Sequence, residues 1–413
     1  MTELQASPPA TAISSRLGEL AVLFLRLGAI SFGGPAAHIA LIEAEFVKKR
    51  QWIARQQFLD MVGAANLIPG PTSTEVAINV GFARAGWAGL CVAGACFILP
   101  AAVITGAFAW AYVRFGSFPQ AESVLAGIKP AVIAVISIAI WRLGKTAVKD
   151  TMLAVLCAAA LGAFFLGWSP IAILFGGGGL GMLARRLPNL RTPGTSIYLT
   201  GGFVRALERG TKNIFRVLFP RSSMAPAMYV PAIPAVQPSI GQIGLFFLKV
   251  GAVLYGGGYV LLAFLDQGLV RQHGWLTHQQ LLDAVAIGQF TPGPVLSTGT
   301  FIGYMLGGIP GAAIATVAIF LPSFLYVALL APLLFRLRKS PWMAAFLDSV
   351  NACAVALMAG VTFRLGADAL RGWATWLIAA AGLGILLRWK INPAWIVLGG
   401  GLLGLLLATF RLT

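Results

Sequence analysis

The chain has 413 residues, of which 58% are hydrophobic and 10% charged, and its mean hydropathy is +0.84. Soluble domains carry about 25% charged residues, so this composition excludes a water-soluble globular protein and predicts an integral membrane protein. The formal net charge is +17. Basic loops stay on the cytoplasmic face and contact anionic lipid headgroups. We therefore interpret the charge as a sign of topology and lipid contact, not of nucleic-acid binding, for which no motif is present.

Residues 1–17 form a short polar N-terminal tail. Because it lacks both a Lys/Arg-rich start and a small-residue cleavage site, we expect the first apolar segment to belong to the mature protein. The first transmembrane repeat, 18–184, then contains apolar segments near 17–47, 58–83, 87–115, 121–143, 151–167 and 169–184. Several exceed the roughly 18 residues that span a bilayer core, which predicts an all-α polytopic membrane protein.

A polar interval, 185–239, separates this repeat from a second one at 240–413. The interval is rich in proline and glycine, and it concentrates basic side chains at Arg185, Arg186, Arg191, Arg205, Arg209, Lys212, Arg216 and Arg221. We therefore expect a basic cytoplasmic linker.

The second repeat reproduces unusual features of the first in the same order. Pro69-Gly70-Pro71 returns 223 residues later as Pro292-Gly293-Pro294. Around it, Phe32-Gly33-Gly34 returns as Tyr255-Gly256-Gly257, Asn66 as Gln289, and Arg142-Leu143-Gly144 as Arg364-Leu365-Gly366. This register indicates a duplicated membrane unit. Broken segments at corresponding positions of two halves point to a transporter's binding site.

Loop charges favour inverted halves, because equivalent loops differ in basic content. The first loop holds four basic residues in the first half, Lys48, Lys49, Arg50 and Arg55, but only Arg271 in the second. A later loop holds only Arg114 in the first half but three basic residues in the second, Arg336, Arg338 and Lys339. The positive-inside rule then places equivalent loops on opposite faces. We predict about five transmembrane helices plus one broken, re-entrant segment per half, with 58–83 as the candidate. If all six segments crossed, the halves would be parallel.

Each Pro-Gly-Pro predicts the end of one helix and the start of another, because proline removes a backbone donor and glycine permits strained dihedrals. The new helix start exposes N–H groups that attract anions. A packing kink is the alternative, but two copies, each preceded by an amide, favour a binding role. The expected substrate-binding residues are Asn66, Pro69, Gly70, Pro71, Thr72, Ser73, Gln289, Pro292, Gly293 and Pro294.

The glycine pairs Gly33-Gly34 and Gly256-Gly257 form a second recurring break. Glycine pairs also allow close helix packing, so a structural role is the alternative to the substrate-binding role that we expect. The two breaks of each half are expected to face each other and form a central cavity.

Charged residues within apolar segments are costly and therefore functional candidates. Arg26 recurs as Lys249, which suits attraction of an anion; pairing with an acid or snorkelling to the interface is the alternative. For coupling to protons we consider Glu43, its counterpart Asp266, and Glu75, which follows only the first Pro-Gly-Pro. The recurring Arg142 and Arg364, near helix ends, are expected to anchor the structure, and the histidines are expected to have no special role.

The Phe-Gly-Gly-Pro element with His38, the Trp-(x)4-Gln-Phe-x-Asp stretch and Asn-x-x-Pro-Gly-Pro resemble the chromate ion transporter family, in particular its long, two-domain members. The resemblance implies efflux of chromate across the bacterial inner membrane, with sulfate as a competing analogue. The second half departs from the pattern, because Gly258 replaces the proline and Thr291 precedes Pro-Gly-Pro. We therefore expect the halves to perform different tasks.

These features predict a secondary transporter and not an enzyme. No P-loop pattern supports ATP-driven pumping, and the four cysteines show no metal-ligand spacing, so no cofactor is expected. Export of chromate, driven by the membrane potential with optional proton exchange, is our first hypothesis. A carrier of sulfate or another oxyanion, including an importer, is the alternative, and the sequence leaves a homodimer open.

Overall fold

The computed structural model describes residues 10–32, 34–116, 118–185, 237–255, 258–337, 340–389 and 391–409. Within these ranges the chain is helical and has no strand, which confirms the predicted all-α fold. Four stretches, two per half, are long and apolar enough to span a membrane: Thr72–Phe115, Ala121–Ala147, Val295–Leu329 and Pro341–Ala369. Gly33, Gly256, Gly257 and nearly all of the expected linker 185–239 lie outside the described residues.

The first apolar segment folds back on itself. Helix α1 (Ala10–Ile30) ends at a break, and α2 (Pro35–Ile42) continues directly into the π-helix η1 (Glu43–Lys49). The glycine that precedes α2 has a φ of 82°, a left-handed conformation that glycine adopts without strain. Arg50, just after η1, forms an ion pair with Glu19 on α1. Both ends of this hairpin therefore lie at the same face of the molecule, which we call the Arg50 face.

The second apolar segment folds back as well. Helix α3 (Arg55–Ala65) leads to the first Pro-Gly-Pro, and α4 (Thr72–Phe115) leaves it. Helix α4 is sharply bent at Gly86, where φ is 60°, and Gly81 packs against Gly89 across the bend. The part before the bend thus returns to the Arg50 face, where Arg84 lies 3.6 Å from Glu19. The re-entrant geometry expected for 58–83 is therefore shared by the preceding segment.

The rest of the first half contains one long helix and a short helical pair. Helix α5 (Pro119–Ala147) is followed by α6 (Thr151–Phe165) and α7 (Pro170–Ala184). The side chains of Asp150 and Ser169 cap α6 and α7 by accepting backbone N–H hydrogen bonds. At 15 residues each, α6 and α7 are about 22 Å long, shorter than the roughly 30 Å bilayer core.

The second half repeats this order of elements. Helix α12 bends as α4 does, with φ of 60° at Gly308, and Gly303 packs against Gly311 across the bend. The elements are α9 (Ile240–Val253), η3 (Gly258–Val260), α10 (Leu261–Leu265), η4 (Asp266–Gln272), α11 (His278–Phe290), η5 (Val295–Ser297), α12 (Thr298–Leu337), α13 (Pro341–Ala369), α14 (Trp373–Arg388) and α15 (Pro393–Thr409).

Equivalent helices of the two halves run antiparallel. On α5 and α13, Gly144 faces Val355, whereas Ile133 faces Gly366, so residue numbers rise on one helix as they fall on the other. Corresponding helices of opposite direction are what inverted repeats require, and the geometry supports that prediction.

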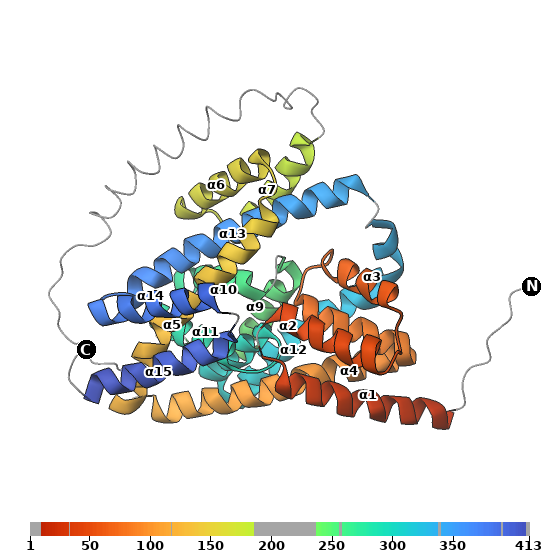
Figure 1. Cartoon of the computed structure of the whole chain (residues 1–413), viewed down its shortest axis with the longest axis horizontal. Helices are drawn as coiled ribbons and strands as arrows, with labels where there is room; N and C mark the ends of the chain where they lie inside the picture. Colours follow the sequence, from red (N-terminus) through yellow and green to blue (C-terminus); the bar gives the residue numbers. More distant parts are fainter. Residues whose placement is uncertain are drawn as a thin grey trace, which may run out of the picture.

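The two halves also exchange their short helical pairs. Helix α13 packs against α6 and α7 of the first half, and α5 packs against α14 and α15 of the second (Figure 1). Helices α4 and α12 are in contact as well. The core is therefore built jointly by both halves, and the broken segments meet inside it.

Candidate functional site

The broken segments of the two halves are joined by a reciprocal pair of backbone hydrogen bonds. The amide of Gly70 donates to the carbonyl oxygen of Leu254 at 2.7 Å, and the amide of Gly293 donates to that of Ser31, also at 2.7 Å. Ser31 and Leu254 occupy equivalent positions, just before the glycine-pair breaks. Each Pro-Gly-Pro therefore rests on the other half's glycine-pair break.

Both Pro-Gly-Pro glycines are fixed by conformation and by space. Their φ angles are 142° at Gly70 and 91° at Gly293, in the region that favours glycine. A Cβ atom at Gly70 would overlap Glu75 and Ser323, and one at Gly293 would lie 2.6 Å from the Cβ atom of Ala101. Any other residue would push the break apart.

A cavity of about 600 Å³ opens beside the first Pro-Gly-Pro. Segments of both halves line it, including Gly70 and the first turn of α4, residues of α2, α5 and α13, and the Tyr255 region. Its polar lining consists of Asn66, Thr72, Arg142, Thr146, Lys149, Tyr255, Asp348 and Asn351. The cavity therefore presents a helix N-terminus, two cations, one carboxylate and several neutral donors to a single space, and this surplus of positive charge and donors suits an anion.

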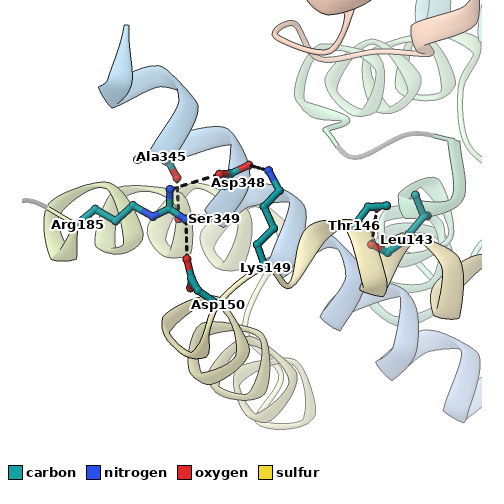
Figure 2. A network of polar contacts seen from close by, with 8 residues as sticks. All are labelled: Leu143, Thr146, Lys149, Asp150, Arg185, Ala345, Asp348 and Ser349. Atoms are coloured by element: carbon teal, nitrogen blue, oxygen red, sulfur yellow. Dashed lines mark hydrogen bonds and ion pairs between the residues drawn. The ribbon is translucent and has the colours of Figure 1, made fainter. Parts of the chain in front are cut away.

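An ion-pair network lies at one end of this cavity, and Figure 2 shows its members. Lys149 and Arg185 lie 2.8 Å and 3.4 Å from the carboxylate of Asp348, and Arg185 also lies 2.9 Å from Asp150. The network joins the ends of α5 and α7 to α13 of the other half. After its bend α4 leads away from the Arg50 face and α5 leads back to it, so the network at the end of α5 lies at the Arg50 face. We therefore place the opening of the cavity at that face.

The two recurring arginines have different surroundings. Arg142 lines the cavity, and its Nη2 lies 3.5 Å from the carbonyl oxygen of Leu386, near the C-terminal end of α14. Arg364 instead lies 3.9 Å from Asp266 and stacks 4.2 Å from the Phe164 ring. The anchoring role predicted for both fits Arg364. Reasoning from the sequence missed the cavity position of Arg142, although its recurrence had marked it.

The cations expected to attract the anion do not reach this cavity. Arg26 and Lys249 are exposed on α1 and α9. Lys249 instead lines a separate cavity of about 300 Å³ with Gln267 and His273. Arg26 and Lys249 therefore recur because they occupy equivalent positions on α1 and α9. The arginine that lines the cavity, Arg142, lies on α5 instead.

Ser73 and His38 join the two breaks of the first half. The buried His38 places Nδ1 3.1 Å from the Ser73 hydroxyl oxygen and Nε2 3.1 Å from the carbonyl oxygen of Ser31. Sequence analysis gave His38 no role, because the equivalent residue is Leu261. Its contacts show that it connects the glycine-pair break to the start of α4.

Glu75 is fully buried one turn after the first Pro-Gly-Pro. Its carboxylate and the Ser323 hydroxyl both approach Gly70. Among the described residues no basic side chain forms an ion pair with Glu75. An uncompensated carboxylate charge is costly to bury, so the position favours a group that exchanges a proton.

The other two coupling candidates differ from Glu75. Asp266 is buried but compensated, with Arg271 at 3.0 Å and His278 at 3.1 Å in addition to Arg364. Glu43 is partly exposed near the beginning of η1. Asp266 therefore has the surroundings of a structural ion-pair centre, and Glu43 those of a surface group.

The second Pro-Gly-Pro is packed differently from the first. Pro292, Gly293 and Pro294 are buried, and none of them lines the 600 Å³ cavity. Gln289, the counterpart of the cavity residue Asn66, is absent from that lining too. The structure therefore brings the predicted residues of the first copy to the cavity and places those of the second copy against the Ser31 break.

In the other half, the place that corresponds to the Asn351 side of the cavity is filled by a buried ion pair. Lys129 on α5 lies 3.1 Å from Asp283 on α11, and the Tyr112 hydroxyl of α4 donates to Asp283 at 2.8 Å. Asp283 is fully buried. The counterpart of Lys129 is the cavity residue Asn351. One half thus has an open cavity where the other has a closed ion pair.

A duplicated multi-pass helical fold with broken helices around a polar cavity defines a membrane transporter. Comparison with known families specifies which kind: a profile described as chromate transporter matches residues 18–182 and 241–405. The chain belongs to the chromate transporter family, whose members are membrane transporters and not enzymes. This confirms the resemblance seen in the sequence.

Relatives cover the chain over nearly its full length. The chromate transport protein of Cupriavidus metallidurans is 33% identical over 96% of this chain and 94% of its own. The probable chromate transport protein of Synechococcus elongatus is 30% identical over 91% of each chain. The uncharacterized transporter YwrA of Bacillus subtilis is shorter and is 29% identical over 36% of this chain and 86% of its own. No solved structure matches.

Proposed function

We propose that this chain is a secondary transporter that exports chromate from the bacterial cytoplasm across the inner membrane. The observation that carries the proposal is the 600 Å³ cavity beside the first Pro-Gly-Pro, which the N-terminus of α4 and the Arg142 side chain both line. The names of the full-length relatives supply chromate as the substrate.

Orientation follows from the basic side chains at each face. The Arg50 face and the adjoining cavity mouth carry a cluster of eight described cations, namely Lys48, Lys49, Arg50, Arg55, Arg84, Lys145, Lys149 and Arg185. Under the positive-inside rule this face is cytoplasmic. The cavity is therefore open to the cytoplasm, in the state that loads a substrate for export.

The cavity suits a tetrahedral dianion. The N-terminus of α4, which no side chain caps, offers backbone N–H donors and the positive end of its dipole, and Thr72 adds a hydroxyl. Asn66 and Asn351 contribute amides. Such donors stabilise an oxyanion without metal or covalent chemistry. Sulfate has the same charge and shape, so we expect it to compete with chromate.

The electrical driving force favours export. Moving one charge through 100 mV changes its free energy by about 2.3 kcal/mol, so a dianion that leaves an inside-negative cell gains roughly 4.6 kcal/mol. Export therefore needs no ATP. Proton exchange through Glu75 adds a second driving force where a pH gradient is present.

Release of the oxyanion on the side opposite the Arg50 face requires a cavity to open in the second half, equivalent to the one now open in the first. The Lys129–Asp283 pair, with the Tyr112 hydroxyl, closes the position equivalent to the cavity. Inverted repeats allow the halves to exchange conformations around a fixed site. We infer that this ion pair separates in the outward-open state while the cytoplasmic cavity closes.

Everted membrane vesicles, whose cytoplasmic face is outermost, test this function. Vesicles containing the chain are expected to accumulate labelled chromate when their interior is positive, and excess sulfate should slow the uptake. Vesicles without the chain provide the control. Equal chromate uptake in both would refute the proposal. Accumulation of sulfate but not chromate would instead identify the chain as a sulfate carrier, and uptake by right-side-out vesicles alone would identify an importer.

A further inference from the structure

One cation in the cavity lacks a counter-ion. Lys149 is compensated by Asp348 at 2.8 Å, and Arg185 by Asp348 and Asp150. Arg142 forms no ion pair with any carboxylate in the part of the chain that the structure describes. Its positive charge is therefore available to whatever enters the cavity.

The guanidinium of Arg142 is held but not saturated. The described contact is one 3.5 Å approach of Nη2 to the carbonyl oxygen of Leu386. Leu386 lies in the last turn of α14, where carbonyl groups without helical partners carry partial negative charge. A guanidinium has five N–H donors in a planar fork, so most of them remain free for a ligand.

The equivalent arginine shows the opposite arrangement. Arg364 has a carboxylate partner in Asp266 and covers the Phe164 ring at the end of α6. Phe164 is the counterpart of Leu386, so both arginines reach the end of an exchanged helix. One has its charge matched by the protein, and the other presents it to the cavity. This difference within a repeated position leaves positive charge available for an anion on the Arg142 side only.

We propose that Arg142 is the residue that binds the transported oxyanion, through two parallel N–H···O bonds, while Arg364 is structural. The inference rests on the proposed transport function and assigns its binding residue. A planar fork matches two oxygens of a tetrahedral oxyanion, whereas a lysine ammonium acts as a point charge. Arg142 therefore provides both charge and geometry.

Equilibrium binding of labelled chromate and labelled sulfate to the purified full-length chain tests this assignment. Arg142→Gln is expected to weaken binding of both ions roughly 10- to 100-fold, the usual value of hydrogen bonds to charged groups. Arg142→Lys should fall between the wild type and Arg142→Gln. Arg364→Gln, the matched control, should bind as the wild type does, because its charge is neutralised within the protein.

The outcomes separate this inference from the transport function. If the wild type binds neither ion, the proposed function itself fails. If the wild type binds and Arg142→Gln binds equally well, Arg142 is not the binding residue, although the function stands. Should Arg142→Gln unfold, Arg142→Lys and Arg364→Lys provide the comparison, since only the former should lose affinity. Equal losses in both would contradict the inference.

Discussion

The amide of Gly70 donates a 2.7 Å hydrogen bond to the carbonyl oxygen of Leu254, in the other half of the chain. The equivalent bond joins Gly293 to Ser31 at the same length. Each hydrogen bond joins one half to the other. An isolated half would therefore leave its Pro-Gly-Pro amide donor and its Ser31 or Leu254 carbonyl acceptor without these partners. At membrane depth such groups cost several kcal/mol, on the order of an unmade hydrogen bond in an apolar medium. The breaks therefore hold the halves together as well as shaping the cavity.

Replacement of Gly70 or Gly293 by alanine should destabilise the protein. The left-handed conformation alone costs about 1–2 kcal/mol for alanine, and the overlaps with Glu75 or Ala101 add to that cost. Thermal unfolding of the purified chain in detergent measures the effect. Gly384→Ala on α14 is the control, because a Cβ atom there meets open space. Equal melting temperatures for Gly70→Ala and Gly384→Ala would refute the packing described for the break.

Cysteine labelling should place Arg50 and its counterpart His273 on opposite faces of the membrane. The antiparallel α5 and α13 require this of inverted halves. In a background without the four native cysteines, Arg50→Cys is expected to react from the cytoplasmic side and His273→Cys from the other. Reaction of both from one side would exclude inverted repeats.

The Lys129–Asp283 pair should contribute measurably to stability, because both groups are removed from water. Loss of one partner of a buried ion pair typically costs roughly 3–5 kcal/mol, since the other charge is left uncompensated. A double-mutant cycle with Lys129→Met and Asp283→Asn, read by unfolding, isolates this coupling. The double variant is expected to lose less free energy of unfolding than the sum of the losses in the two single variants. Additive losses would indicate no coupling between the charges.

Glu75→Gln tests the proton-exchange part of the mechanism. The substitution preserves shape and removes the titratable proton, so the fold and potential-driven export should persist. Stimulation of chromate export by a pH gradient should disappear. Glu43→Gln, on a partly exposed carboxylate, is the matched control and should retain the stimulation. A Glu75→Gln variant that still responds to the gradient would remove Glu75 from the coupling pathway.

Much of this architecture could be predicted from the sequence, because Pro-Gly-Pro and the glycine pairs have direct backbone consequences and recur in register. The position of Arg142 in the cavity lining could not be predicted. Arg26 and Lys249 seemed favourable from their depth in apolar segments, but which side of a helix faces a cavity depends on packing between halves. That packing includes the exchange of α6 and α7 for α14 and α15, which no periodicity within either half encodes.

The expectation that the halves perform different tasks rests on local differences at Gly258, Thr291 and Glu75. The larger difference lies at Lys129 and Asn351, which are equivalent positions on α5 and α13. A lysine there meets a buried aspartate, whereas an asparagine lines a cavity. Neither consequence could be deduced without knowing that Asp283 lies opposite.

Substrate protection at Asn351 tests most directly whether the oxyanion occupies this cavity. In a cysteine-free background, Asn351→Cys should react with a water-soluble thiol reagent applied to everted vesicles. Chromate or sulfate, but not chloride at equal ionic strength, should slow that reaction. Lys48→Cys, at an exposed position on the Arg50 face and outside the cavity lining, should react at the same rate with or without either ion. Labelling of Asn351→Cys at a rate unaffected by both oxyanions would contradict the account.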